Sequence, residues 1–210
     1  MAKRPVAKAK KKPSRTYHHG TLRAALIDAT LRLVEEGGAE AVTVREAARR
    51  AGVSSGAPFR HFPNRTVLMT AVAEEATHRL HAAVMAAVEP VTAEPPLVQL
   101  RAIGRAYLQW ASENPTHFAV VSNRGLIDYE SSPSMQRENE DIQALMGRLL
   151  DAAGAPAGAK LAARALVYGL ARMRIDGHLP QWGVASSQEA LAAMDAALDL
   201  FLEGLLRPRG

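Results

Sequence analysis

The hydrophobic residues of this chain recur at intervals of three and four positions, which is the spacing of amphipathic α-helices. The first helical segment runs from Thr21 to the Gly37-Gly38 pair, which suits a C-cap. No segment alternates apolar and polar residues in the manner of a half-buried strand. We therefore predict an all-α fold of about nine helices, over residues 21–37, 44–51, 55–62, 66–90, 97–113, 116–122, 134–153, 159–178 and 187–206.

Capping residues set several of the predicted helix boundaries. Thr43 and Glu46 form a capping box, in which the threonine hydroxyl accepts from the Glu46 amide and the carboxylate reaches back. Asn64 is the N-cap of the long helix, and Ser186 with Glu189 forms a second capping box before the last one. Helices should therefore begin directly after these capping residues.

Breaks in the pattern divide the chain into four parts. Four predicted helices precede the proline-rich break at residues 90–96, and five follow it. We expect a basic arm, a small helical domain, a connecting helix and a larger helical domain, over residues 1–16, 17–65, 66–90 and 91–210.

The net charge of +5 is unevenly distributed. Residues 1–16 carry seven lysines and arginines and no acid, whereas the rest of the chain has 19 basic and 21 acidic residues. A segment with so much charge and so little to bury is expected to be disordered. It would be attracted to polyanions through counterion release, and a solubilising tail or a remnant of cloning is an equally good interpretation.

The composition excludes several classes of protein. Without cysteine the chain has no disulfide, thiolate zinc site or thiol redox sensor, which suits a reducing, cytoplasmic environment. No apolar run approaches the roughly 18 residues of a membrane span, and the sequence after the basic N-terminus is too polar for a signal peptide. Nucleophile elbows and phosphate-cradling glycine loops are missing. We expect no membrane partner, no cofactor, no metal and no enzymatic activity.

Two short predicted helices meet at Gly52 in a helix-turn-helix pattern. Alanines on the first helix let the second approach closely, and the start of the second would enter a DNA major groove about 12 Å wide. From residue 43 to residue 65 five arginines accompany a single acid, Glu46, which gives a local excess of +4. Surface arginines on alanine-rich helices are often only solvated, so this charge alone leaves DNA binding open.

The residues from Thr43 to Phe62 resemble the DNA-binding signature of the tetracycline-repressor (TetR) family. The resemblance extends over residues 17–75 and includes the entry sequence Tyr17-His18-His19-Gly20. Residues 165–170, followed by Asp176-Gly177, resemble the C-terminal signature of the subgroup with a WHG-type regulatory domain, with Tyr168 in place of the usual histidine. The resemblance implies a ligand-responsive, sequence-specific transcriptional regulator, commonly a repressor that a small molecule releases from a palindromic operator.

Carried over position by position, the family signature implies a set of DNA-contacting residues. Arg60 is the best candidate for a bidentate contact with guanine, and Arg65 stands where the family usually has a lysine against a phosphate. The expected contacts to double-stranded DNA are Thr43, Arg45, Ser54, Ser55, Gly56, Ala57, Arg60, His61 and Arg65.

Two positions depart from the family signature. Phe59 replaces a tyrosine whose hydroxyl meets a phosphate, so that hydrogen bond is lost. Pro58 replaces an aliphatic residue, and because proline lacks an N–H it suits a first helical turn. The base-reading helix should therefore be short and capped by Ser55. His61 could instead of contacting DNA be a partly buried structural residue, and Phe62 belongs to the core.

The resemblance also implies a homodimer, built from the last two helices of each subunit as a four-helix bundle. Two recognition helices about 34 Å apart would then meet successive major grooves. The final helix carries an apolar face wide enough for its own domain and for a partner, with an internal core as the alternative. That face contains Leu191, Met194, Leu198, Phe201, Leu202 and Leu205.

A family-type pocket for an unidentified small organic effector would lie among the fifth to eighth helices. Apolar and aromatic walls with a few polar groups suit such a ligand, although each of these residues is individually more often core. The candidate lining residues are Tyr107, Trp110, Phe118, Met146, Leu149, Tyr168, Arg172 and Met173.

Other interpretations stay open at this point. Glu74, His78 and His81 share one helix face and could hold zinc or nickel, but such a trio is more often solvated surface. The alternative functions are an architectural DNA-binding protein without an effector and, less favoured, a helical enzyme with an incidental basic tail.

Overall fold

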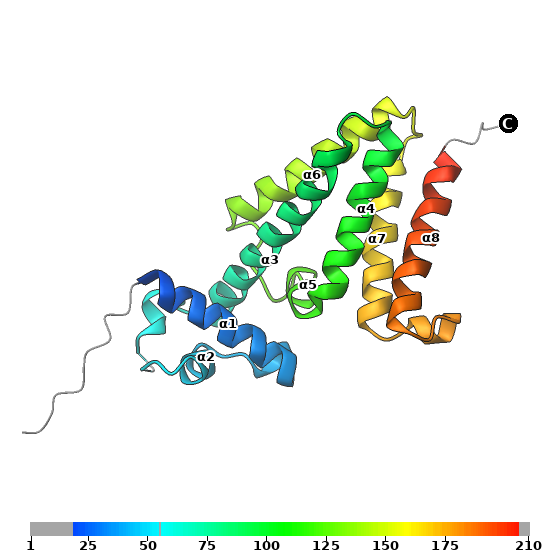
Figure 1. The fold of residues 1–210 in the computed structure, drawn as a ribbon. Coiled ribbons are helices and arrows are strands. Elements are labelled where there is room, and N and C mark those ends of the chain that lie inside the picture. Colours follow the sequence, from blue (N-terminus) through cyan, green and yellow to red (C-terminus); the bar gives the residue numbers. More distant parts are fainter. Residues whose placement is uncertain (1–18, 55, 206–210) are drawn as a thin grey trace, which may run out of the picture.

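The computed structural model describes residues 19–54 and 56–205, all of which lie in helices or in the turns between them (Figure 1). This part of the chain contains eight α-helices: α1 His19–Gly37, α2 Val44–Arg50, α3 Arg65–Val88, α4 Pro96–Glu113, α5 Pro115–Val121, α6 Pro133–Ala152, α7 Ala159–Ile175 and α8 Ser187–Leu205. Short 3₁₀ segments lie at η1 Ala39–Ala41, η2 Pro58–Arg60, η3 Glu89–Val91 and η4 Leu179–Trp182. The predicted all-α fold class is confirmed.

Three of the sequence-based predictions rest wholly or partly on residues outside the described ones, namely the basic arm over residues 1–16, the entry sequence that begins with Tyr17-His18, and the role of Ser55. No described helix combines the length and the apolar character that crossing a membrane requires.

The third predicted helix, over residues 55–62, is wrong as an α-helix. Within its described residues the only regular element is the short 3₁₀ segment η2. Pro58 is the first residue of η2, a position where a missing N–H breaks no helical hydrogen bond. The Ser54 carbonyl accepts from the Ala57 amide at 3.1 Å, a bond that spans three residues rather than the four of an α-helix. We call residues 56–62 the turn segment.

The two predicted capping boxes form to different degrees. The Thr43 hydroxyl accepts from the Glu46 amide at 3.0 Å, but the Glu46 carboxylate bonds to Arg49 instead of reaching back. Before α8 both halves are present, because Ser186 accepts from the Glu189 amide at 3.1 Å and the Glu189 carboxylate accepts from the Ser186 amide at 2.9 Å. The first box is therefore half-formed and the second complete.

Two hydrophobic cores share the long helix α3. Its first half, from Leu68 to Ala73, packs with α1, α2 and Phe62. Its second half, from Ala76 to Val88, packs with residues of α4 to α8. Figure 1 shows α3 running from α1 and α2 at one end of the molecule toward the tip of the larger helical domain. The division between the two cores therefore falls within α3.

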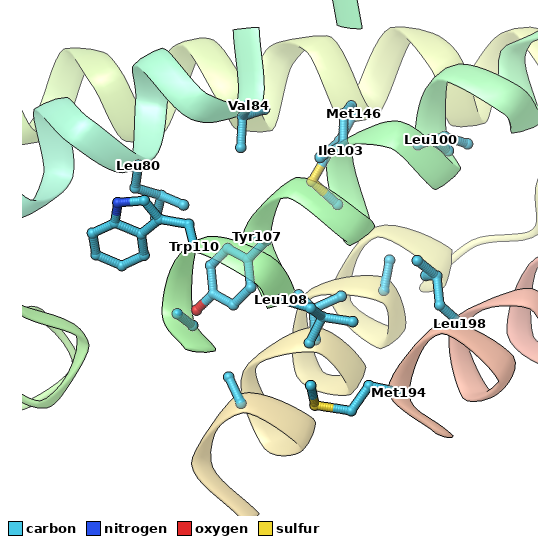
Figure 2. Packing of buried hydrophobic residues seen from close by; sticks show 14 of the residues in the cluster. Leu80, Val84, Leu100, Ile103, Tyr107, Leu108, Trp110, Met146, Met194 and Leu198 are labelled. Atoms are coloured by element: carbon cyan, nitrogen blue, oxygen red, sulfur yellow. The ribbon is translucent and has the colours of Figure 1, made fainter. Parts of the chain in front are cut away.

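Helix α4 lies at the centre of the larger core. Figure 2 shows its buried side chains between those of α3, α6 and α8. Gly104 allows α8 to come close, because a Cβ at this position would lie 2.6 Å from Leu198 Cδ2. An ion pair between Arg101 and Asp199 joins the same two helices at the surface.

Candidate nucleic-acid interface and effector cavity

Small buried residues hold α2 against α1. Ala47 and Ala48 are fully buried, so the helix lies close to its neighbours. Gly52 then adopts a φ of 69°, in the left-handed region that favours glycine. The Val53 amide bonds to the Ala48 carbonyl at 3.1 Å and closes the turn. The bend predicted at Gly52 is therefore present.

The turn segment has a buried side and an exposed side. Pro58 and Phe62 are buried, and Phe62 belongs to the core as predicted. Gly56 and Arg60 are exposed, and Phe59 keeps 39% of its surface accessible. The segment is therefore anchored by two side chains while Arg60 stays in contact with solvent.

Some arginines around the turn are already paired. Arg49 donates to Glu46 at 2.9 Å, and Arg50 makes two hydrogen bonds of 2.6 Å to Glu36. These hydrogen bonds hold the pKa values of Glu36 and Glu46 below their ordinary range. The net positive charge beside the turn is consequently smaller than the +4 counted over residues 43–65, because Glu36, which pairs with Arg50, lies outside that range.

Arg45 and Arg60 differ from the other arginines. Both are exposed, and among the described residues neither side chain has an ion-pair partner. Arg65 is half-buried, and its Nη2 donates to the Ala39 carbonyl at 2.8 Å and lies 3.7 Å from Glu40. Arg45 and Arg60 are thus the arginines of this region most available to an external anion.

A polar chain connects this region to helix α6. The Glu74 carboxylate accepts from Arg23 of α1 at 3.0 Å and from the buried Ser132 hydroxyl at 2.9 Å. Ser132 is the N-cap of α6. The Arg23 guanidinium also lies over the ring of Phe62, 6.0 Å from its centroid. Contacts therefore run from the end of the turn segment through α1 and α3 to α6.

The trio weighed as a metal site has other partners. Glu74 takes part in the polar chain above, and His78 Nδ1 lies 2.8 Å from Glu138 while His81 Nε2 lies 3.4 Å from Asp141. Across the described residues, no group of three such side chains is arranged to hold a metal ion. The two histidines instead join α3 to α6.

Two adjoining cavities lie in the larger domain. The first, of 480 Å³, is enclosed by α3, α4, α6, α7 and α8 and has mostly apolar walls. The second, of 360 Å³, carries more polar groups, among them Arg124, Tyr129 and Tyr168. Both cavities share Leu80, Tyr107, Asn139, Leu161 and Arg164. A third cavity of 510 Å³ lies where α1 meets α5 and α7.

Two family signatures match the chain in these two regions. Residues 26–72 match the bacterial regulatory proteins of the tetR family, and residues 100–198 match the tetracyclin repressor-like C-terminal domain. The chain belongs to the TetR family. No curated protein matches it.

Solved structures share the fold of this TetR-family chain. A protein of unknown function from Rhodococcus sp. RHA1 is 27% identical, with a TM-score of 0.73 over 92% of this chain and 100% of that one. A tetR-family regulatory protein from Rhodococcus RHA1 is 20% identical, with a TM-score of 0.70 over 89% and 98%. A TetR variant from Acinetobacter baumannii AYE, in complex with minocycline, is 21% identical, with a TM-score of 0.61 over 90% and 96%. The similarity therefore spans both domains.

The residues that the TetR signature assigns to DNA have different environments. Thr43, Arg45, Ser54, Gly56 and Arg60 are exposed on α2 and beyond the Gly52 turn. Ala57, His61 and Arg65 are partly buried, and the His61 ring lies 6.4 Å from that of Phe62. The exposed subset is the part of the signature that a duplex could reach without rearrangement.

The predicted effector residues are divided among the cavities. Tyr107 and Met146 line the first cavity, and Phe118 and Tyr168 line the second. Arg172 lines the third and pairs with Asp176 at 2.9 Å. The three cavities do not include Trp110, Leu149 or Met173; the first two are buried in the core.

Sequence reasoning missed two basic side chains of the first cavity. Lys160 and Arg164 both line the first cavity from the first turns of α7. The spacing of Lys160 and Arg164 at i and i+4, next to apolar residues, indicated that they share one helix face. Hydrophobic periodicity, however, predicts that charged residues lie on the surface.

The α8 residues predicted for the dimer interface mostly face their own domain. Met194, Leu198 and Leu202 are buried in the larger core, and Phe201 and Leu205 are partly buried. Leu191 is 37% exposed. Leu200, which was not predicted, is 67% exposed. Within one copy of the chain the apolar face of α8 packs chiefly against its own domain, and the outward side carries Leu200.

Proposed function

We propose that this chain is a ligand-responsive, sequence-specific DNA-binding regulator of transcription without enzymatic activity, acting in the cytoplasm. Its operator is a palindrome, and a small organic molecule releases it, so that it works as a repressor. The observation that carries this proposal is the pair of exposed arginines, Arg45 and Arg60, on either side of the left-handed turn at Gly52, neither of which has an ion-pair partner among residues 19–54 and 56–205.

The side chains around the turn divide the work of binding DNA. Arg60 reads a base edge, because an exposed guanidinium can donate two hydrogen bonds to guanine. Arg45 and the exposed Thr43 contact phosphates, which set the register on the duplex without reading sequence. Arg65, held by the Ala39 carbonyl, adds a phosphate contact from the start of α3. Gly56 and Ala57 allow the backbone to approach the groove.

A homodimer presents two such surfaces to one palindrome. The family pattern of a four-helix bundle from α7 and α8 supports this assembly. The exposed Leu200 supplies an outward apolar contact on α8, and small residues at Ala193, Ala196 and Gly204 let a partner helix come close. Recognition elements about 34 Å apart would meet successive major grooves.

The cavities provide a means of release. A ligand in the first cavity touches α6, whose N-cap Ser132 bonds to Glu74, which in turn bonds to Arg23 of α1. A ligand that prefers one arrangement of these helices changes the population of DNA-competent dimers. By linkage, DNA must lower ligand affinity by the same factor.

Selection of bound sequences from random duplexes tests this function. The full chain should recover a palindrome with half-sites centred about 10 base pairs apart, or a multiple of that spacing. Recovery of unrelated sequences in proportion to the input library would contradict the proposal and would favour an architectural DNA-binding protein.

A further inference from the structure

The first cavity combines an apolar interior with a basic edge. Its deep walls include the buried Leu80, Val84, Ile103 and Val167. Its edge carries Lys160 and Arg164, both exposed on the first turns of α7. Among the residues that the structure describes, no aspartate or glutamate lines this cavity or the adjoining one. The site is thus asymmetric in both polarity and charge.

Arg164 lies where the two cavities meet. Its guanidinium carbon is 4.9 Å from the centroid of the Tyr107 ring and 5.6 Å from that of Tyr168. Stacking on these rings holds the guanidinium in place. Within the described part of the chain no carboxylate pairs with Arg164 or Lys160, so their positive charge is not neutralised by the protein.

Neutral polar groups surround Arg164 at this junction. Tyr107 and Asn139 line both cavities. The Tyr107 hydroxyl can donate a hydrogen bond, and burial raises the pKa of this phenol further above its ordinary value of 10.0. The junction therefore offers several donors for a negatively charged oxygen and has no fixed negative charge to repel it.

We propose that the effector is an amphipathic carboxylate, with its hydrocarbon tail in the first cavity and its carboxylate on Arg164, with Lys160 nearby. This inference rests on the proposed function and names the chemical class of its ligand. The volume of 480 Å³ lies within the roughly 300–1,000 Å³ of small-molecule sites. A guanidinium that is already stacked forms a bidentate bond to a carboxylate at little further cost in ordering.

Calorimetric titration of the full chain without DNA tests the ligand class. Hexanoate, octanoate and decanoate form a series in which each added methylene should lower Kd about fourfold, because burying a CH₂ contributes about 0.8 kcal/mol. Decylamine has the same tail and the opposite charge, and should bind at least about tenfold more weakly than decanoate.

Substitution of the basic edge locates the carboxylate. Arg164→Gln should weaken decanoate binding by about 10- to 100-fold, the range for a charge-assisted hydrogen bond, and should leave the affinity for decan-1-ol within about twofold. Lys160→Gln should cause a smaller loss of the same kind. Arg148→Gln, at an exposed position of α6 that lines none of the three cavities, is the matched control and should bind decanoate normally. Thermal unfolding verifies that each variant is folded.

The possible results separate this inference from the proposed function. Equal affinity for decanoate and decylamine, or normal decanoate binding by Arg164→Gln, would overturn the ligand class while a recovered palindrome kept the DNA-binding function intact. Decanoate binding that depends on Arg164, in a protein that selects no palindrome, would support the ligand class and contradict the regulator.

Discussion

Arg23 of α1 and Glu74 of α3 form an ion pair of 3.0 Å between residues 51 positions apart in the chain. The second oxygen of Glu74 accepts from Ser132, the N-cap of α6, at 2.9 Å. Because α6 lines the first cavity and Arg23 lies over Phe62, Glu74 has one partner beside the turn segment and one on the helix that lines this cavity. It lies close to the division of α3 between the two cores.

Replacing Glu74 tests whether this link holds α1 in place. Glu74→Gln removes the negative charge that pairs with Arg23, so the backbone amides of α1 should exchange with solvent faster. The coupling free energy between ligand binding and operator binding should change by about 0.5–2 kcal/mol. Glu75→Gln is the control, because Glu75 pairs with Arg79 on the same helix. Hydrogen exchange followed by mass spectrometry reads both variants, and equal protection of α1 in the two would refute the link.

Arg60→Ala tests base reading. We expect a loss of about 1–3 kcal/mol on the selected operator, with relaxed preference at one base pair of each half-site. Arg49→Ala is the matched control, since the exposed Arg49 side chain is paired with Glu46 and should affect all sequences alike. Competition binding against single-base variants makes the measurement. Equal losses on specific and random DNA would mean that Arg60 contacts only the backbone.

Leu200→Arg tests the outward face of α8. A charge introduced at a desolvated dimer contact should shift the chain toward monomer and reduce operator affinity, because one half-site alone binds weakly. Val98→Arg, at an apolar position of α4 that is 41% exposed, controls for the added charge. Sedimentation velocity measures the assembly, and identical profiles for the two variants would place the interface elsewhere.

Gly104→Leu tests the close approach of α4 and α8. The new side chain would collide with Leu198, and overpacking of this kind costs about 1–3 kcal/mol of unfolding free energy. Gly147→Leu on α6 is the control, because a Cβ there meets nothing within 4 Å. Urea unfolding compares the two, and equal stability would show that the helices separate without cost.

His117 gives the fold a defined response to acid. Burial, with the nearby Arg79, lowers the pKa of His117, and its Nε2 is buried without a hydrogen bond to any described residue. The folded chain therefore prefers the neutral ring, so this stability is complete above the unfolded value of about 6.5 and is lost as pH falls through the lower folded value. His117→Gln should make the unfolding temperature less sensitive to pH below about 6.5.

The contribution of His78 to stability has the opposite pH dependence. The hydrogen bond that His78 donates to Glu138 raises the pKa of His78, so its contribution to stability is complete below about 6.5 and is lost as pH rises through the folded value. His78→Gln should therefore steepen the loss of stability in acid. A pH series of thermal unfolding in which both variants shift in the same direction would contradict these assignments.

The sequence predicted the fold wherever local signals and packing agreed. Eight helices, the cap at Thr43 and the bend at Gly52 follow from periodicity and from backbone preferences. The segment 55–62 was predicted as an α-helix, but within its described residues only the 3₁₀ turn Pro58–Arg60 forms. So short a segment offers too few periodic positions to distinguish a 3₁₀ turn from an α-helix.

Contacts between distant residues could not be predicted in this way. Pairing of Arg50 with Glu36 depends on how α1 packs on α2, and the meeting of Glu74 with Ser132 spans 58 residues. Likewise an apolar face on α8 has the same periodicity whether its partner is α4 or another subunit. Only the three-dimensional arrangement shows that Met194 and Leu198 face inward.

The most direct test of sequence-specific binding around Gly52 is the affinity of the purified chain for its selected palindrome and for a shuffled duplex of equal length and composition. At about 0.15 M salt we predict that the palindrome binds at least about 10³-fold more tightly. Equal affinity for the two duplexes would contradict the assignment of this surface to reading DNA.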